Sequence, residues 1–514
     1  MSKTIIIIGA GLAGLSAALQ AAENGCNVKL VSSLPSERAQ SVMAEGGINA
    51  ALNTKDENDS PEEHFTDTIK AACGLADPNA VWGMTQAAPE LVHWLLKLGV
   101  KFNMSGYDDV DLRNFGGQKK KRTAFAQSDT GKQIMTAMID AVRRKEASGM
   151  VERFSHHSFL TLRLCGNICC GCVIRDEYSQ ETVELPGDAV IVATGGMHGL
   201  FGNTTGSLSN TGEVTAELFR LGVPLANGEM IQYHPTTVKC GGKRMLISEA
   251  ARGEGGRLFA MKDGKQWYFM EEKYPELGNL MPRDITAREI WKVSHESEVF
   301  LEMTEISEEI ISNKLSGLAD DCMTYLHKDI RKEPVSVLPG IHYFMGGILV
   351  DEQHRTPIQN LYAAGECCAQ YHGANRLGGN SLLGALYGGR VAAKSACEQA
   401  DVVDLSCATQ IDFPPASQIS EIKQLNKVMQ ETMGVVRNEN TLLNGIQTVQ
   451  ALTGNLPLLG MAVLKSALAR KESRGAHWRE DYPKSNDDDY LKTTVARFDG
   501  KQIQISFVPV PERR

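Results

Sequence analysis

Residues 4–31, TIIIIGAGLAGLSAALQAAENGCNVKLV, decide the fold of this chain. The run Ile5–Ile8 is entirely β-branched, which is typical of a strand buried on both faces of a parallel sheet. It is followed by the motif GAGLAG at residues 9–14, a helix-like segment and a second apolar strand at Val28–Val31. A G-x-G-x-x-G motif in this strand, turn, helix and strand context predicts a dinucleotide-binding site.

We expect a different structural role for each of the three glycines of this motif. Gly9 permits a tight turn, Gly11 lets backbone N–H groups approach a pyrophosphate, and Gly14 lets the helix pack close to the strand. The second strand ends in Ser32-Ser33, where a ribose-binding Asp or Glu is usual. A hydroxyl can still bind a ribose, so this position by itself leaves both FAD and NAD open.

Two later segments repeat the pattern of a buried strand that ends in glycine. They are AVIVATGG at residues 189–196 and LYAAGE at residues 361–366, and a Gly-rich helix entry follows at residues 378–392. A large dinucleotide that lies across one sheet needs contacts from distant parts of the chain. These segments therefore favour FAD.

Composition excludes several classes of protein. The 514 residues carry a net charge of −9 and are 42% hydrophobic, as in an ordinary globular protein. An acidic balance argues against a nucleic-acid partner, and we interpret the basic run at residues 119–122, KKKR, as a solvated loop. The apolar stretch at residues 4–22 is interrupted by the glycines of the dinucleotide motif, so we expect no direct membrane insertion.

The cysteines predict neither a disulfide scaffold nor a metal site. Twelve in 514 residues are few and unevenly spaced, and we interpret them as reduced thiols of a cytoplasmic protein. The densest group, at residues 165–172, is interpreted as two short strands around a Gly-Asn turn in which cysteine acts as a small apolar residue.

Five short polar segments carry His or Arg beside Gly or Pro, which is typical of loops that face a site. They are residues 232–236, 248–256, 282–284, 342–347 and 372–377. Several cations directed at one pocket suit an anionic substrate, because arginine binds carboxylates with two hydrogen bonds. Glu249 and Arg252 are three residues apart and would share one face of a helical turn.

Together these segments resemble the flavoprotein subunit of fumarate reductase and succinate dehydrogenase, a family that includes L-aspartate oxidase. The resemblance runs from residue 3 to about residue 508. It rests on these runs: GAGLAGL (9–15), AEGGINAAL (44–52), FGGQ (115–118), QYHPT (232–236), SEAARGEGG (248–256), PRD (282–284), HYFMGG (342–347), LYAAGE (361–366), HGANRLGGNSL (372–382) and ESRGAHWREDYP (472–483).

The resemblance implies an enzyme that interconverts fumarate and succinate, and reduces fumarate by hydride transfer from flavin N5. Arg283 corresponds to the family's proton donor, and Glu249 and Arg252 correspond to its proton relay. The substrate dicarboxylate would be bound by His234, Ser248, His342 and Arg376.

The resemblance also implies the FAD contacts, which carry over by position. They are Gly9, Ala10, Gly11, Gly14, Ser32, Glu45, Gly46, Gly47, Glu366, Ser381 and Leu382, with Glu213 where an Asp is usual. Members of membrane complexes have a flavin-linking histidine six residues before Gly46. Gln40 stands at that position, so we predict non-covalent FAD, which favours fumarate reduction over succinate oxidation.

L-aspartate oxidase is the alternative function. In that enzyme a glutamate usually precedes the Gly-Gly pair of the FGGQ-like run, where it can pair with the substrate ammonium. Phe115 occupies this position and favours an uncharged carbon instead. A non-catalytic flavoprotein is a third hypothesis, and retention of Arg283, His234, His342 and Arg376 argues against it.

The expected fold class is α/β: a Rossmann-like FAD-binding domain with an inserted α+β capping domain and a C-terminal helical domain. We place the FAD-binding domain at residues 1–230 and 346–407, the capping domain at 231–345 and the helical domain at 413–514, which ends in a strand. The sequence has no paired cysteine motif for an iron–sulfur cluster, so we expect a separate iron–sulfur subunit or other redox partner. Such a partner would place a cytoplasmic protein at the inner face of the membrane.

Overall fold

The predicted dinucleotide motif opens a parallel sheet. In this computed structural model, which describes residues 2–106, 109–401, 411, 413 and 418–514, its strands lie in the order β20-β10-β1-β2-β6. All neighbours in this sheet are parallel. The strands are β1 (Thr4–Ile8), β2 (Asn27–Ser32), β6 (Val151–Ser155), β10 (Ala189–Val192) and β20 (Leu361–Ala363). The strands expected from the three apolar runs are therefore confirmed.

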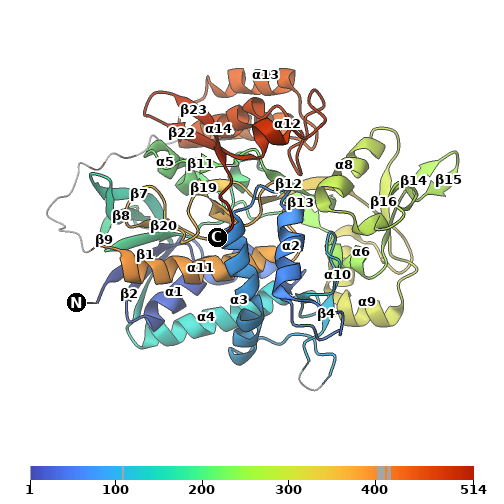
Figure 1. The fold of residues 1–514 in the computed structure, drawn as a ribbon, viewed down its shortest axis with the longest axis horizontal. Helices are drawn as coiled ribbons and strands as arrows, with labels where there is room; N and C mark the ends of the chain where they lie inside the picture. The colour runs from blue at the N-terminus through green and yellow to red at the C-terminus, as the bar shows by residue number, and fades with distance from the viewer. Residues whose placement is uncertain (1, 107–108, 402–410, 412, 414–417) are drawn as a thin grey trace.

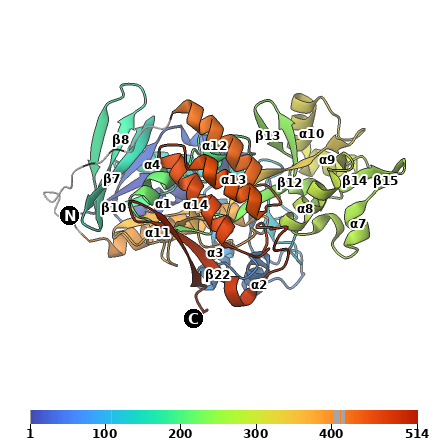
Figure 2. The same cartoon turned by 90° about the horizontal axis from the view of Figure 1, so that it is seen from above.

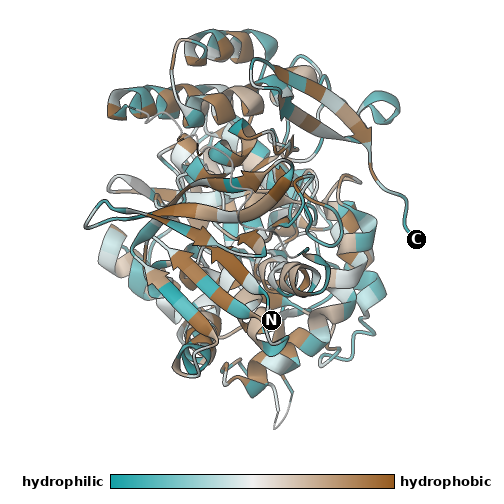
Figure 3. Cartoon of the chain, turned by 90° about the vertical axis from the view of Figure 1, so that its left-hand side faces the viewer, coloured by the Kyte–Doolittle hydropathy of each residue, from teal (hydrophilic) through white to brown (hydrophobic). Residues whose placement is uncertain are grey.

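Alternate residues of β1 enter two different cores, because successive side chains of a strand point to opposite faces. Ile5 and Ile7 pack with helices α1 (Leu12–Glu23), α4 (Thr130–Ala147) and α11 (Asn380–Gln399). Ile6 and Ile8 pack with a three-stranded antiparallel sheet on the opposite face. The sheet therefore lies between a helical layer and a β layer (Figure 1), and Figure 3 shows the brown apolar stretches along these strands.

The three-stranded layer contains the cysteine-rich segment. It consists of β7 (His157–Cys165), β8 (Ile168–Asp176) and β9 (Thr182–Pro186), so the predicted pair of strands around a Gly-Asn turn is confirmed. Cys169 and Cys172 are buried in the core with Ile6 and Ile8. Among the described residues no group of His, Cys, Asp and Glu could hold a metal ion.

The prediction of reduced thiols is wrong at one of the described cysteines. Cys165, at the end of β7, is disulfide-bonded, whereas ten other described cysteines are free. The spacing of the cysteines along the sequence did not reveal this bond.

The prediction of a solvated basic loop is wrong at its last residue. Arg122 is fully buried and forms ion pairs of 2.9 Å with Asp59 and with Asp67, whereas Lys119 and Lys121 are exposed. Arg122 precedes β5 (Thr123–Ala124), which lies between β3 (Ile48–Asn49) and β4 (Leu112–Arg113). Asp67 belongs to helix α2 (Pro61–Ala71), which packs against α3 (Pro78–Lys97). The carboxylates of Asp59 and Asp67, which lie far from Arg122 in the sequence, compensate its charge. The local sequence therefore could not predict that Arg122 is buried.

A second lobe forms the right-hand side of Figure 1 and has its own hydrophobic core. Its first sheet consists of β12 (Ile231–Cys240), β13 (Lys243–Leu246) and β18 (Leu338–Phe344), and its second of β14 (Arg257–Lys262), β15 (Lys265–Trp267), β16 (Val299–Glu302) and β17 (Val335–Ser336). Its helices are α6 (Glu249–Gly253), α7 (Phe269–Lys273), α8 (Arg283–Val293), α9 (Glu308–Lys314) and α10 (Ser316–Asp321). This mixed composition agrees with the α+β insertion in the expected fold class, and its exact limits stay a prediction.

Helices of the C-terminal part lie across the top of the molecule in Figure 1, and Figure 2 shows them from above. They are α12 (Ile419–Thr432), α13 (Glu439–Val449) and α14 (Asn455–Ala469), with a short α15 (Asp487–Tyr490) after them. Their apolar faces share a core with α5 (Glu213–Arg220). The helical spacing predicted after residue 413 is confirmed.

The chain ends in a hairpin that the sequence predicted only in part. The expected strand is β23 (Ile503–Pro509), and it pairs with β22 (Lys492–Phe498). In turn β22 pairs with β11 (Leu225–Ala226), in a sheet that continues through β19 (Gly347–Leu349) to β21 (Cys368–Ala369). The C-terminal part is therefore joined by backbone hydrogen bonds to segments that lead into the candidate site. No helix in the described ranges is both long and apolar enough to cross a bilayer.

Candidate active site

A cavity of about 1120 Å³ extends from the first turn of the parallel sheet to the second lobe. Its lining includes most of the residues that the sequence selected: Gly9, Ala10, Gly11, Ser32, Glu45, Gly46, Gly47, Phe115, Glu213, His234, Ser248, Glu249, Arg283, His342, Glu366, Arg376, Ser381 and Leu382. The two exceptions are Gly14 and Arg252, which do not line it. Residues spread over 374 positions of sequence thus converge on one space.

The turn after β1 has the close packing that the motif predicts. A Cβ atom on Gly9, whose φ is +110°, would lie 2.3 Å from the carbonyl oxygen of Ala193. A Cβ atom on Gly14 would lie 1.8 Å from the carbonyl oxygen of Gly9. Helix α1 therefore starts at the cavity wall, where Leu12 lines the cavity and its backbone N–H donates to the Ser41 hydroxyl over 3.3 Å. The other N–H groups of the first turn have no acceptor within the helix. This arrangement is suited to a pyrophosphate.

Unpaired polar atoms in the cavity wall also fit a dinucleotide. The Ser32 hydroxyl and one carboxylate oxygen of Glu45 are buried and have no hydrogen-bond partner within the described residues. Burial, together with the nearby Asp321, raises the pKa of Glu45 to about 8. Glu366 accepts a hydrogen bond of 3.0 Å from the Phe344 backbone N–H, and burial raises its pKa to about 7. Buried polar groups of this kind need a partner, and FAD offers hydroxyls and ring nitrogens.

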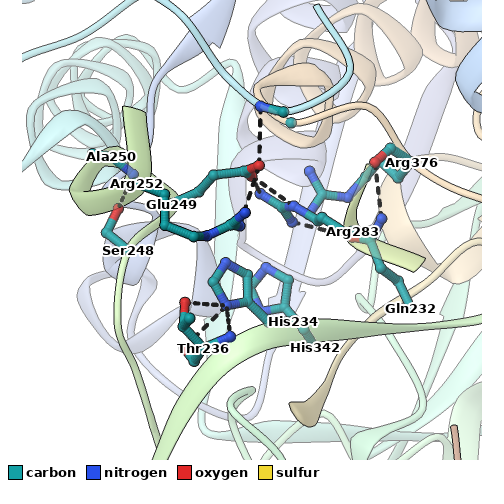
Figure 4. A network of polar contacts seen from close by, with 12 residues as sticks. Gln232, His234, Thr236, Ser248, Glu249, Ala250, Arg252, Arg283, His342 and Arg376 are labelled. Carbon is teal, nitrogen blue, oxygen red and sulfur yellow. Dashed lines mark hydrogen bonds and ion pairs between the residues drawn. The ribbon is translucent and has the colours of Figure 1, made fainter. Parts of the chain in front are cut away.

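Arg283 and Glu249 form the centre of the polar network in Figure 4. Nε and Nη2 of Arg283 donate to the same oxygen of Glu249 over 2.7 and 2.5 Å. Nη1 of Arg283 donates to the side-chain oxygen of Gln232 over 3.1 Å. Arg283 is the first residue of α8 and Glu249 the first of α6, so two helix starts bring these groups together.

Arg252 contacts Glu249 but does not line the cavity. Its Nη2 is 3.4 Å from Oε1 of Glu249, and its Nη1 donates to the Asn279 carbonyl over 2.6 Å. The predicted helical turn is present as α6, and it places the two side chains on one face. Burial acts to raise the pKa of Glu249, but Arg283 and Arg252 outweigh it and the net pKa is lowered. Glu249 is therefore a carboxylate held between two guanidinium groups.

His234 and His342 lie side by side on neighbouring strands β12 and β18. Their ring centroids are 5.1 Å apart at an angle of 67° (Figure 4). Nδ1 of His342 is 2.8 Å from the Thr205 hydroxyl. Burial and then the positive charge of Arg283 lower the pKa of both histidines. Both rings are thus neutral near pH 7, and each can offer an N–H to an anion.

Arg376 lies opposite these histidines with little compensation for its charge. Its guanidinium carbon lies 4.4 Å from the centre of the Tyr343 ring, and its Nε has no partner within the described part of the chain. Burial, followed by repulsion from Arg283, lowers the pKa of Arg376 to about 9. A buried cation without a paired carboxylate fits a site that receives an anion.

Phe115 is a buried apolar residue of the cavity lining. Its side chain is 1% exposed and packs against the backbone of Gly46 and Gly378, where a Cβ atom would clash. Ser248 is the N-cap of α6, with its hydroxyl 3.4 Å from the Ala250 N–H, and it also lines the cavity. Gln40 lines the cavity at the start of a short helical turn, residues 40–43.

Comparison with known proteins identifies the family of the whole chain. The family described as FAD binding domain matches residues 4–382, and the family described as fumarate reductase flavoprotein C-term matches residues 452–513. The succinate dehydrogenase flavoprotein subunit of Bacillus subtilis is 38% identical and covers 100% of this chain and 98% of its own length. The 8-methylmenaquinol:fumarate reductase flavoprotein subunit of Wolinella succinogenes is 32% identical over 100% of this chain and 92% of its own.

The chain belongs to the fumarate reductase and succinate dehydrogenase flavoprotein family. The solved FrdA chain of an Escherichia coli quinol fumarate reductase variant has the same fold, with a TM-score of 0.90 at 27% identity, and the match covers 99% of this chain and 97% of that chain. The chain is thus an FAD-binding oxidoreductase of this family, and the expected fold class is confirmed.

Three groups in this flavoprotein were not selected from the sequence. The side-chain oxygen of Gln232 accepts a hydrogen bond from Arg283, and Nε2 of Gln232 donates to the Arg376 carbonyl over 2.8 Å. The Gly116 N–H donates to Oε1 of Glu249 over 3.0 Å, and the Thr205 hydroxyl contacts His342. Gln232 and Gly116 lie within the QYHPT and FGGQ motifs, which are the sequence signal for them. Nothing in the sequence around Thr205 marks it.

Proposed function

We propose that this flavoprotein reduces fumarate to succinate, with Arg283 as the proton donor. The observation that carries the proposal is the Arg283–Glu249 contact at the wall of a cavity that also contains His234, His342 and the poorly compensated Arg376. When bound, reduced FAD supplies a hydride from N5 to one alkene carbon. The protein residues bind the dianion, direct it and provide the proton.

The substrate carboxylates are bound by His234, Ser248, His342 and Arg376. The two neutral imidazoles and the serine hydroxyl offer hydrogen bonds, while Arg376 offers a guanidinium whose charge is not used by a carboxylate of the protein. Arg283 adds positive charge between them. Cations placed at the carboxylates withdraw electron density and stabilise the carbanion-like transition state.

The proton moves along Arg252, Glu249 and Arg283. An arginine gives up a proton only transiently, because its ordinary pKa exceeds 12. Glu249 is bonded to Nε and Nη2 of Arg283, so a proton taken up by Glu249 can be returned to the same guanidinium. Arg252 contacts the other oxygen of Glu249 and lies outside the cavity, so it can supply that proton from the protein side.

Fumarate reduction is tested directly by steady-state assays of the FAD-loaded chain with reduced viologen and fumarate. We expect turnover with fumarate, slower oxidation of succinate with an artificial acceptor, and no comparable oxidation of aspartate. The buried apolar ring of Phe115 offers nothing to a substrate ammonium. Turnover of aspartate equal to that of fumarate would contradict the proposal and favour L-aspartate oxidase.

FAD is bound without a covalent link in this proposal. Gln40 stands at the cavity where the family's flavin-linking histidine is expected, and an amide does not form that bond. Acid precipitation should release the yellow flavin into the supernatant. Flavin that stays with the protein pellet would contradict this part of the proposal.

Electrons for fumarate come from a separate protein in this proposal. We infer an iron–sulfur subunit or another redox partner, because the sequence provides no cysteine pattern for a cluster of its own. Such a partner would hold the flavoprotein at the inner face of the membrane. Copurification of the chain with an iron-containing subunit from its own cells would support this. Full fumarate reductase activity of the isolated chain with a small-molecule donor from those cells, without any second protein, would contradict it.

A further inference from the structure

Two free thiols far from the active site lie in contact with each other. The sulfur atoms of Cys26 and Cys397 are 2.9 Å apart, although 371 residues separate them in sequence. Cys26 precedes β2, and Cys397 lies in the last turn of α11. Unbonded sulfur atoms at this distance need only a small approach to form a disulfide.

The two cysteines join the far ends of the two helices that begin at the cavity. Leu12 at the start of α1 and Ser381 at the start of α11 both line it. The helices touch along their length: the Ser16 hydroxyl donates to the Leu386 carbonyl over 2.7 Å, and a Cβ atom on Gly389 would lie 2.3 Å from the Ala13 carbonyl. A bond between Cys26 and Cys397 would fix this helix pair at the end opposite the cofactor.

We propose that Cys26 and Cys397 form a reversible disulfide by exchange with a low-molecular-weight disulfide. Cys397 is the more exposed thiol, so it reacts first: its thiolate attacks the small disulfide, forms a mixed disulfide and releases one small thiol. The Cys26 thiolate then attacks the Cys397 sulfur and expels the second small thiol. Two protein thiols are oxidised, one small disulfide is reduced, and the protons end on the two released thiols.

Two observations bear on the rate and the setting of this exchange. Burial and then the neighbouring Cys26 thiol raise the pKa of Cys397, so exchange should be slow near pH 7 and faster as pH rises. Cys165, on the β layer that covers the other face of the sheet, is already disulfide-bonded. This protein therefore already contains a disulfide-bonded cysteine outside the Cys26–Cys397 pair.

The test is peptide mapping of the full FAD-loaded chain. Reduced protein is incubated with oxidised glutathione at pH 7 and pH 8.5, the remaining thiols are blocked with N-ethylmaleimide, and the protein is digested without reductant. Cleavage after Glu398 is needed, because it separates Cys397 from the next cysteine in the sequence, Cys407. We expect a cross-linked peptide pair containing Cys26 and Cys397, lighter by two hydrogen atoms than the two free peptides, that forms faster at pH 8.5.

Two variants show whether the bond is specific. In Cys397→Ser the cross-linked peptide should be absent and Cys26 should be alkylated. Cys73→Ser, which removes another half-buried free thiol, should leave the cross-link unchanged. Recovery of both Cys26 and Cys397 as alkylated thiols, or of Cys397 only as a mixed disulfide with glutathione, would overturn the proposal.

A physical consequence gives a second measurement. A bond that closes so long a loop restricts the unfolded chain, so oxidation should raise the Tm of the wild-type protein by a few degrees and slow the release of FAD. The same treatment should leave Cys397→Ser unchanged in both. If mapping confirms the cross-link but neither the Tm nor the rate of FAD release changes, the bond does not hold the helix pair. Neither measurement depends on the reaction that the enzyme catalyses.

Discussion

Two buried arginine clusters of this flavoprotein differ in how their charges are satisfied. In the C-terminal part, Arg470 uses all five of its N–H groups: Nε donates to Glu229, Nη1 to Glu472 and the Tyr490 carbonyl, and Nη2 to the Lys492 carbonyl and the Thr494 hydroxyl. In the cavity, Arg376 faces an aromatic ring and has no paired carboxylate, and its Nε is unpartnered within the described residues.

The difference separates a structural network from a site. A buried cation whose donors are all used by the protein stabilises the fold only while its partners remain. A buried cation with unused donors costs free energy until a ligand arrives. Both clusters carry similar sequence signals, Arg beside Gly and His, so the number of unsatisfied donors distinguishes them better than the residue types do.

The largest expected effect is on the reaction. Arg283→Ala should lower kcat for fumarate by about 10³-fold or more, since a positioned proton donor contributes about 10²–10⁴-fold. The FAD content and visible spectrum of the variant should match those of the wild type. Steady-state kinetics with reduced viologen measures the change, and undiminished turnover with normal FAD content would exclude Arg283 as the donor.

A large effect on stability is expected from the other cluster. Arg470→Met should destabilise the protein by about 3–5 kcal/mol, because it removes the arginine that pairs with the buried Glu229 carboxylate and leaves Glu472 with Arg474 alone. The lower Tm would be seen by calorimetry of the FAD-loaded chain. A Tm equal to that of the wild type would mean that the network does not depend on Arg470.

The same replacement in the cavity should act in the opposite way. Arg376→Met should lower kcat/KM for fumarate by about 10²-fold, because a carboxylate of the substrate loses its charged partner. The Tm of the FAD-loaded, substrate-free protein should stay the same or rise, because a poorly compensated buried charge is removed. A drop in Tm like that of Arg470→Met would break the distinction between the two clusters.

The smallest expected effect is a pH dependence. Binding of the dianion needs charged Arg376, whose pKa in the free enzyme is about 9. Below that pH the residue is charged and kcat/KM for fumarate should not depend on it. Above that pH kcat/KM should fall by about tenfold per pH unit, as expected for one proton. In Arg376→Lys this limb should move to a different pH, and a limb unchanged in the variant would assign the titration to another group.

Local patterns in the sequence were enough for the dinucleotide turn, whereas the family resemblance identified most of the residues that line the cavity. Ile5–Ile8 and the glycines at 9, 11 and 14 specify a buried strand and its turn by backbone sterics alone, which act between near neighbours. Glu249 and Arg252 were placed on one face by helical periodicity. The family resemblance then predicted that residues far apart in the sequence share one site, and it predicted a role for each.

Only the tertiary structure decided which of these charges are compensated and which are left for a ligand. The local sequence around Arg122 is typical of a solvated loop, but in the folded chain Arg122 is paired with Asp59 and Asp67. Thr205 likewise contacts His342 only because folding brings the two segments together. Cys26 and Cys397 meet in the same way across most of the chain. Such pairings depend on long-range packing and burial, whereas the strands and turns depend on steric preferences that each short segment already contains.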